Sequence, residues 1–255
     1  MTAHNTEPFR RHDTDTALPT LPHLTSMTWR HGLFVHWPIS PDALRPQLPD
    51  PLALETWEGD AWISVLPFVL VNVGLRGSPS ATRIAFPELN VRTYVRYRDD
   101  PGLFFFSVDV GNPLVAAAAG QTRLPVRYAQ MHVSGSETGI SFSSRRTDVN
   151  PATAGEPDRE SGWFSATYRP DGDAFRPEPD TLEYWLTERR RFYAPANGDV
   201  LTAEVSHEPW PLQPAEVTIH ENTLFEADGL PVPTESPIAY YCDELSMTGS
   251  VPRRL

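Results

Sequence analysis

Six polar side chains occupy alternate positions between residues 88 and 98 of this sequence. Successive side chains of a β-strand point to opposite faces, so these six share one face if the segment is a strand. Arginine can hold a carboxylate by two parallel hydrogen bonds, and glutamate can take or give a proton. We therefore assign Arg92 as an anion anchor, Glu88 as an acid or base, and Asn90 and Tyr94 as groups that orient a substrate. A solvent-exposed strand face would show the same pattern, so both interpretations stay open.

A second polar pair follows on the next predicted strand, which covers residues 103–110. Ser107 and Asp109 alternate there with apolar residues. The intervening Asp-Asp-Pro-Gly segment is typical of a tight turn, which predicts antiparallel pairing of the two strands. We expect Ser107 and Asp109 to lie beside the face of Glu88 and Tyr94 and to contribute to the same ligand site. A purely structural hydrogen-bonded pair is the alternative.

Two later segments add candidate polar groups. Glu188 and Arg189 precede an aromatic pair and are expected to reach inward, although a buried structural ion pair would look the same in sequence. The arginines at 190 and 191 are interpreted as favourable charges in the last turn of a helix. His207, which precedes Pro-Trp, is a second candidate acid or base, with a structural hydrogen bond as the alternative.

The sequence contains no lysine, and all 21 of its Lys and Arg residues are arginine. Covalent chemistry at a lysine amine is therefore excluded. Glycine-rich nucleotide loops and the G-x-S-x-G pattern of hydrolases do not occur, and no Cys/His spacing predicts a metal site. We expect neither a metal nor another cofactor, and we interpret Cys242 as a packing residue.

Charge and composition limit the partners. With 33 acidic against 21 basic residues, the net charge of −12 would repel nucleic acid and anionic membranes. The longest apolar stretch, residues 61–75, is too short and too interrupted for a membrane helix. A single cysteine excludes an intramolecular disulfide, and no secretory pattern is seen, so we expect a cytoplasmic protein. The expected partner is a small anionic molecule, and a homo-oligomer stays open.

The pattern of elements predicts a mainly β fold with a few short helices. About ten β-type segments are separated by Pro, Gly and Asp clusters, which favours a barrel or sandwich over a doubly wound sheet. Helices are predicted at residues 42–48, 114–120, 182–192 and 214–229. We expect residues 1–24 to be a disordered tail, 25–255 to be one domain, and 147–162 to be a long surface loop.

Five motifs occur in the order seen in a bacterial family, the YqjF-like proteins. They are Phe86–Val95, Gly102–Asp109, Leu124-Pro125 with Ala129 and Met131, Leu186–Arg189, and His207-x-Pro-Trp210. That family is distantly similar to acetoacetate decarboxylase, and the resemblance implies a β-barrel or cone-shaped sheet that encloses a pocket. The resemblance does not predict the same reaction, because acetoacetate decarboxylase uses a Schiff-base lysine and this chain has no lysine. The segment 120–123 also departs from the pattern expected of relatives.

Three hypotheses about function follow. The first is an enzyme, lyase-like or hydrolase-like, that acts on a small carboxylate or oxo acid without Schiff-base chemistry. The second is a non-catalytic barrel in which the same residues only bind the anion. In the third hypothesis, Glu88 and Arg92 form a structural ion pair that fixes the sheet, and the protein functions by binding another protein.

Overall fold

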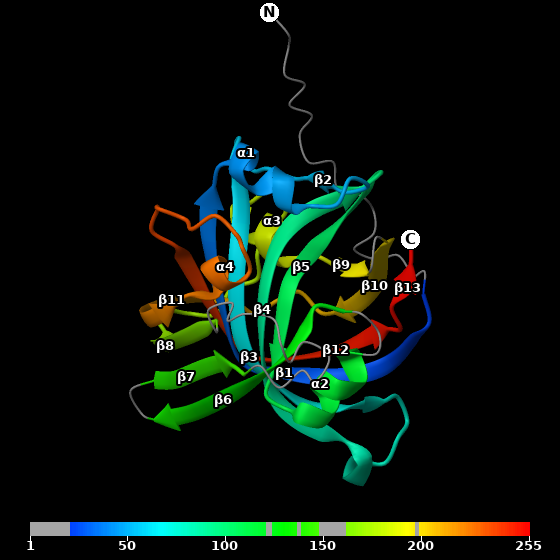
Figure 1. The fold of residues 1–255 in the computed structure, drawn as a ribbon. Helices are drawn as coiled ribbons and strands as arrows, with labels where there is room; N and C mark the ends of the chain where they lie inside the picture. Colours follow the sequence, from blue (N-terminus) through cyan, green and yellow to red (C-terminus); the bar gives the residue numbers. More distant parts are fainter. Residues whose placement is uncertain (1–20, 121–123, 137–138, 148–161, 197–198) are drawn as a thin grey trace, which may run out of the picture.

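Strands dominate the computed structural model, which describes residues 21–120, 124–136, 139–147, 162–196 and 199–255. The prediction of a mainly β chain with a few short helices is confirmed (Figure 1). The strands are β1 (His23–Ile39), β2 (Ala53–Leu54), β3 (Ala61–Leu75), β4 (Ile84–Tyr97), β5 (Asp100–Val110), β6 (Val126–Ser136), β7 (Gly139–Arg146), β8 (Trp163–Pro170), β9 (Arg191–Ala196), β10 (Asp199–His207), β11 (Gln213–Asn222), β12 (Ile238–Ser250) and β13 (Arg253–Arg254). The helices are α1 (Pro41–Leu44), η2 (Arg45–Gln47), η3 (Ser80–Thr82), α2 (Pro113–Gly120), α3 (Leu182–Thr187) and α4 (Leu224–Ala227).

The strands form one sheet that closes on itself along two circuits. In the first circuit, each strand is hydrogen-bonded to the next in the order β1, β3, β4, β5, β9, β10, β12 and back to β1. In the second, β6, β7, β8 and β11 connect β5 to β12 instead. Figure 1 shows β4 and β5 in the middle, with β6, β7, β8 and β11 on the left and β9, β10 and β12 on the right. The pair β4 and β5 is therefore a wall shared by two interiors.

The two interiors differ in their contents. The interior on the side of β7 and β8 is filled by an apolar cluster, which includes Leu33, Val35, Leu89, Val91, Phe142, Phe164, Ala166 and Tyr168. The other holds a cavity, described below. The first circuit of strands closes through a close approach of β5 to β9. A Cβ at Gly102 would lie 2.7 Å from the carbonyl oxygen of Arg191 there. Only glycine allows the two backbones to meet at this distance.

Two helix predictions, for residues 214–229 and 182–192, do not agree with the structure. Residues 213–222 form β11 rather than a helix, because every second residue packs on the core: Ala215, Val217 and Ile219 are partly buried against it, while the intervening residues are exposed. α3 begins after Thr181, whose hydroxyl accepts a hydrogen bond from the Tyr184 amide, and it ends at Thr187 instead of continuing to 192. The interpretation of the arginines at 190 and 191 as helix-end charges is therefore wrong.

The chain ends and loops are described only in part. Of the predicted tail 1–24, residues 1–20 lie outside the described residues, while Leu21 is buried and β1 begins at His23. Most of the predicted loop 147–162, namely 148–161, also lies outside them.

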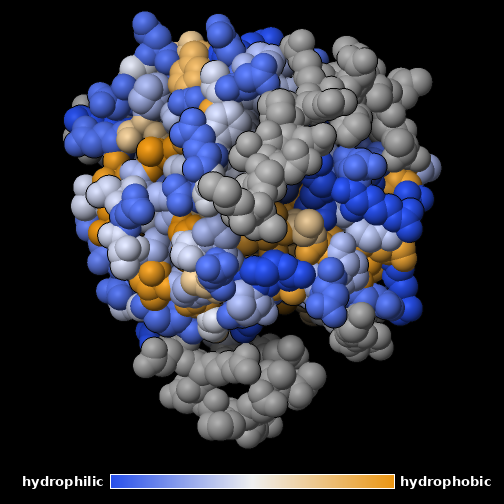
Figure 2. Space-filling view, turned by 90° about the horizontal axis from the view of Figure 1, so that it is seen from above, coloured by the Kyte–Doolittle hydropathy of each residue, from blue (hydrophilic) through white to orange (hydrophobic). Residues whose placement is uncertain are grey.

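No helix in the described ranges is both long and apolar enough to span a membrane. The face shown in Figure 2 is mainly hydrophilic, with hydrophobic residues in several separate groups.

A buried charge cluster fastens the wall to the apolar interior. The guanidinium of Arg146, on β7, donates from Nε to Asp109 of β5 at 2.9 Å and from Nη1 to Asp228, after α4, at 2.6 Å. Its Nη2 donates to the Ser107 hydroxyl at 2.6 Å. The side chains of Arg146, Asp109 and Asp228 are all at most 6% exposed. This cluster therefore joins three elements that are distant in sequence.

Replacing Arg146 by methionine should cost about 3–5 kcal/mol in the free energy of unfolding, because both aspartates would lose their main counter-charge while staying buried. Urea unfolding measures this change. The matched control is Arg145→Met, one residue earlier on the same strand, where the side chain is exposed and the change should stay within about 0.5 kcal/mol. Equal effects of the two substitutions would contradict a structural role for the cluster.

Candidate functional site

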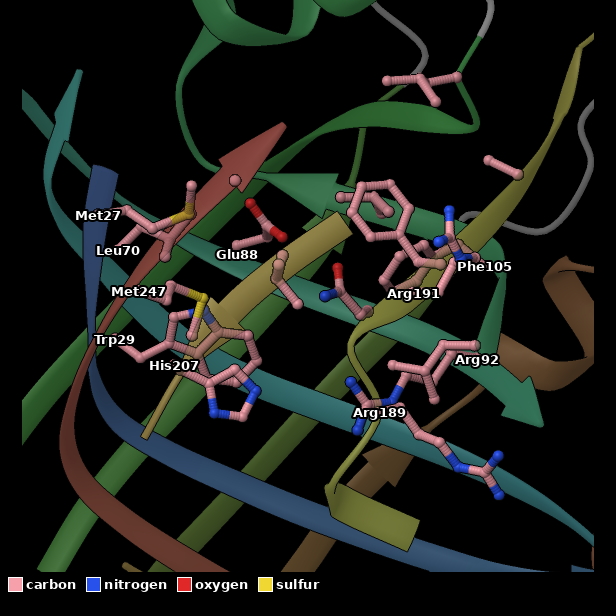
Figure 3. Close-up of a pocket in the computed structure, with 18 of the residues that line it drawn as sticks. Met27, Trp29, Leu70, Glu88, Arg92, Phe105, Arg189, Arg191, His207 and Met247 are labelled. Carbon is pink, nitrogen blue, oxygen red and sulfur yellow. The ribbon is translucent and has the colours of Figure 1, made fainter. Parts of the chain in front are cut away.

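A cavity of about 250 Å³ lies inside the first circuit of strands (Figure 3). All seven strands of that circuit contribute to its lining. The lining residues are Thr25, Met27, Trp29, Leu70, Glu88, Asn90, Arg92, Leu103, Phe105, Val108, Leu124, Pro125, Val126, Thr187, Arg189, Arg191, Phe192, Ala194, Val205, His207, Trp210, Met247, Gly249 and Ser250. Most of them are apolar, and the polar ones lie mainly on β4, on β9 and in the segment that joins α3 to β9.

The alternation of β4 brings three predicted site residues to the cavity. Glu88, Asn90 and Arg92 all line it, whereas Leu89 and Val91 face the apolar interior on the other side of the wall. The face is therefore a cavity wall and not a surface in contact with bulk solvent. The strand alternation was sufficient to group these three side chains correctly.

Arg92 is buried and has no carboxylate partner in the part of the chain that the structure describes. It is 4% exposed, it forms no ion pair with any residue that the structure describes, and its Nε has no hydrogen-bond partner there. Its guanidinium lies 6.0 Å from the centre of the Phe34 ring. Burial lowers the pKa of Arg92, yet an arginine side chain keeps its proton in proteins. The cavity wall thus carries a positive charge that pairs with no carboxylate of the described residues.

Glu88 lies toward the apolar side of the same cavity. Burial raises the pKa of its carboxyl from 4.5 to about 8, and a hydrogen bond from the Asn90 side chain lowers it only in part. The carboxyl is therefore mostly protonated at neutral pH and can donate a proton. Asn90 keeps its Oδ1 without a hydrogen-bond partner among the described residues. Glu88 and Arg92 do not form an ion pair, so the hypothesis that they pair to fix the sheet is wrong.

Tyr94 lies behind the cavity instead of lining it. Its hydroxyl is 2.8 Å from the Ser64 hydroxyl and 3.1 Å from His36 Nδ1, and these two atoms are 2.7 Å apart. Burial raises the pKa of Tyr94, and its hydroxyl also hydrogen-bonds the Arg92 side chain. Tyr94 therefore orients Arg92 and does not reach the space where a substrate would lie.

Ser107 and Asp109 face away from the cavity, contrary to the prediction. Near the turn, Arg92 pairs with Phe105, and an unbroken register would then pair Asn90 with Ser107. A β-bulge intervenes, so Val91 pairs with Ser107 and Leu89 with Asp109. A shift of one residue exchanges the two faces of a strand. Both side chains consequently join Arg146 in the other interior.

Glu188 and Arg189 separate into different roles. Arg189 lines the cavity, and its Nη1 also donates to Glu55 at 2.6 Å while its guanidinium lies over the Trp185 ring. Glu188 does not line the cavity, because its carboxylate accepts the Trp210 backbone amide at 2.8 Å and pairs with Arg190 at 3.1 Å. The alternative of structural ion pairs therefore describes Glu188, and it describes Arg189 in part.

His207 lines the cavity from β10. Its Nδ1 lies 2.7 Å from the Glu208 carbonyl oxygen, and because a carbonyl only accepts, Nδ1 carries the proton and Nε2 keeps its lone pair. Burial, with the charges of Arg190 and Arg92, lowers the pKa of His207 to about 3. The imidazole is thus neutral at physiological pH, with its ring against Trp210.

Arg191 and Thr187 also line the cavity, but the sequence did not predict them as site residues. Arg191 was assigned to a helix end, whereas it opens β9 and pairs with Glu204 at 2.5 Å and with Asp100. The strand-forming residues Phe192 and Tyr193 next to it were the available signal. No group of three or more His, Cys, Asp or Glu side chains in the described ranges is arranged to hold a metal ion.

Solved structures with the same fold place this architecture in a known class. One is the enduracididine biosynthesis enzyme MppR with HEPES buffer bound, with a TM-score of 0.62, 16% identity, and coverage of 94% of this chain and 90% of that chain. Another is acetoacetate decarboxylase from Legionella pneumophila, with a TM-score of 0.54, 14% identity, and coverage of 100% and 98%. At these identities the likeness shows the fold, which is that of acetoacetate decarboxylase-like proteins.

The sequence defines the family more narrowly. Residues 26–246 match the family DUF2071, described as "Uncharacterized conserved protein (COG2071)". The chain is also 40% identical over 216 residues to the uncharacterized protein YqjF of Bacillus subtilis (strain 168). The matched region covers 84% of this chain and 85% of YqjF. This chain belongs to that family, and the resemblance found from its motifs is confirmed.

The raised pKa of Glu88 predicts a pH-dependent stability. Between pH 4.5 and about 8 the folded protein keeps a proton that the unfolded chain has released, so the free energy of unfolding falls as pH rises. Relative to Glu88→Gln, the wild type should lose up to about 1.4 kcal/mol per pH unit between pH 6 and pH 8.

Urea unfolding of both proteins at several pH values measures this difference. Glu235→Gln is the matched control, because Glu235 is exposed, and its pH profile should run parallel to that of the wild type. A constant difference between wild type and Glu88→Gln would show that Glu88 is ionised in the folded state across this range.

Proposed function

We propose that the cavity binds a small carboxylate, preferably an oxo acid, with Arg92 as the anchor of the carboxylate group. The observation that carries this proposal is the buried guanidinium of Arg92, which lines the cavity and has no ion pair among the described residues. A buried charge without a partner is costly. An anionic ligand would supply the missing counter-charge and two parallel hydrogen bonds.

The other charged groups around the cavity favour one anion at this place. Arg189 is paired with Glu55, and Arg191 is paired with Glu204, so each already has a carboxylate neighbour. Glu88 is mostly protonated, and His207 is neutral. The cavity therefore has an uncompensated positive charge centred on Arg92, which suits a monovalent anion.

Glu88 supplies an acid in the same cavity. A protonated carboxyl can donate a hydrogen bond or a proton to an oxygen atom of a bound ligand, which is acid catalysis. Because the sequence contains no lysine, such chemistry would proceed without a Schiff base on a lysine side chain. MppR, a structural neighbour, has been solved in a complex with pyruvate, which supports 2-oxo acids as the first compounds to test.

Thermal unfolding with a panel of small carboxylates and 2-oxo acids, with inorganic phosphate for comparison, tests the anchor. At a hundred times its dissociation constant, a ligand should stabilise the wild type by about 2.7 kcal/mol. Arg92→Met should remove this stabilisation, while the unliganded variant should be at least as stable as the wild type because a buried unpaired charge is gone.

Arg98→Met, at the first position after β4, is the matched control. Arg98 is exposed and lies outside the cavity lining, so the variant should respond to ligand like the wild type. If Arg92→Met binds the carboxylates as well as the wild type does, the proposed function fails.

The role of Glu88 as a donor predicts that affinity depends on pH. Above pH 8 the ionised carboxylate no longer donates and repels the anion, so the dissociation constant should rise about tenfold per pH unit well above the pKa. Isothermal titration calorimetry between pH 6.5 and pH 9.5 measures this. Glu88→Gln keeps a donor without a titrating proton, and its affinity should stay constant; a parallel loss in both proteins would rule out Glu88.

A further inference from the structure

The cavity has two chemically different sides. Figure 3 shows Arg92, Arg189, Arg191 and Phe105 together on the right, and Met27, Trp29, Leu70 and Met247 together on the left, beside His207 and Glu88. A molecule that only carried a carboxylate would use the right side and leave the left side in contact with water. The residues on the left side therefore indicate the chemical character of the rest of the ligand.

Six residues make up what we call the apolar wall. They line the cavity and belong to, or pack against, one hydrophobic cluster: Met27, Trp29, Leu70, Val108, Val126 and Met247. The strand register brings them together, because Met27 pairs with Met247, Trp29 with Leu70, and Val108 with Val126. The wall is thus built from five strands and not from a chance exposure of one side chain.

The position of the wall relative to Arg92 is set by β4. Val108 pairs with Asn90, two residues before Arg92 on that strand, and Phe105 pairs with Arg92 itself. Along a strand, two residues span about 7 Å. A ligand whose carboxylate binds Arg92 would therefore need a body several bonds long to contact the wall.

We propose, on the basis of the proposed function, that the ligand is a carboxylate with an apolar tail, a branched-alkyl or arylalkyl 2-oxo acid and not a three-carbon acid. A cavity of about 250 Å³ lies just below the roughly 300–1,000 Å³ of typical small-molecule pockets, so the tail is short. Two methionines in the wall adapt to different tail shapes. The site thus discriminates strongly between apolar and polar tails and less strongly between tails that differ in branching.

Calorimetric titration with pyruvate, 2-oxobutyrate, 4-methyl-2-oxopentanoate and phenylpyruvate tests the inference. These acids share the head group and differ in the tail. Each methylene buried against the wall should tighten binding about fourfold. 4-Methyl-2-oxopentanoate should therefore bind well over tenfold more tightly than pyruvate, by the same area relation.

Met27→Gln is the diagnostic variant, because it keeps the length of a partly buried side chain and makes the wall polar. It should weaken the binding of the long acids several fold more than it weakens the binding of pyruvate. Met131→Gln is the matched control, since Met131 is also partly buried but packs in the other interior. Its binding series should match that of the wild type.

The outcomes separate the two proposals. If all four acids bind with similar affinity and Arg92→Met abolishes binding, the carboxylate site stands and the apolar-tail inference is wrong. The inference is also wrong if Met27→Gln weakens pyruvate and the long acids by the same factor. If none of the acids binds to the wild type, the proposed function fails and the inference fails with it.

Discussion

The site depends on one constraint, namely that both faces of β4 are buried. In most sheets with one polar face, that face meets water, and its charges cost little. Here β4 belongs to a wall between two interiors, so Glu88, Asn90 and Arg92 line a cavity while Leu89 and Val91 complete an apolar core. Burial raises the pKa of Glu88 to about 8. Burial also lowers the pKa of Arg92, but the guanidinium keeps its proton and stays charged beside the cavity. The unusual electrostatics of both side chains therefore follow from the double closure of the sheet.

Two buried arginines on opposite sides of this wall differ in whether a carboxylate of the described residues compensates their charge. Arg146 donates to Asp109, Asp228 and Ser107, so its hydrogen-bonding capacity is used within the protein. Arg92 has Tyr94 behind it and Phe34 beside it, but no carboxylate among the described residues. A protein that needed only stability at position 92 would gain from an apolar residue there. Under the proposed function, an anionic ligand supplies the partner that Arg92 lacks among the described residues.

The sequence predicted the fold class and the central trio of the site for physical reasons that are local. Period-two alternation places Glu88, Asn90 and Arg92 on one face, whatever the strand pairs with. It could not predict the bulge that turns Ser107 and Asp109 to the other interior, because one extra residue in a strand leaves no mark in the hydrophobic pattern of Leu103–Val110. Glu55, the partner of Arg189, lies 134 residues away and could come only from the tertiary structure.

The most direct test of the central claim is a crystal structure of the protein grown with 4-methyl-2-oxopentanoate. The account predicts the ligand inside the seven-strand circuit, with its carboxylate oxygens about 2.7–2.9 Å from the guanidinium nitrogens of Arg92. A carboxylate bound at Arg189 or Arg191 instead, or density outside the cavity with Arg92 turned to a protein carboxylate, would contradict the claim that Arg92 is the anchor.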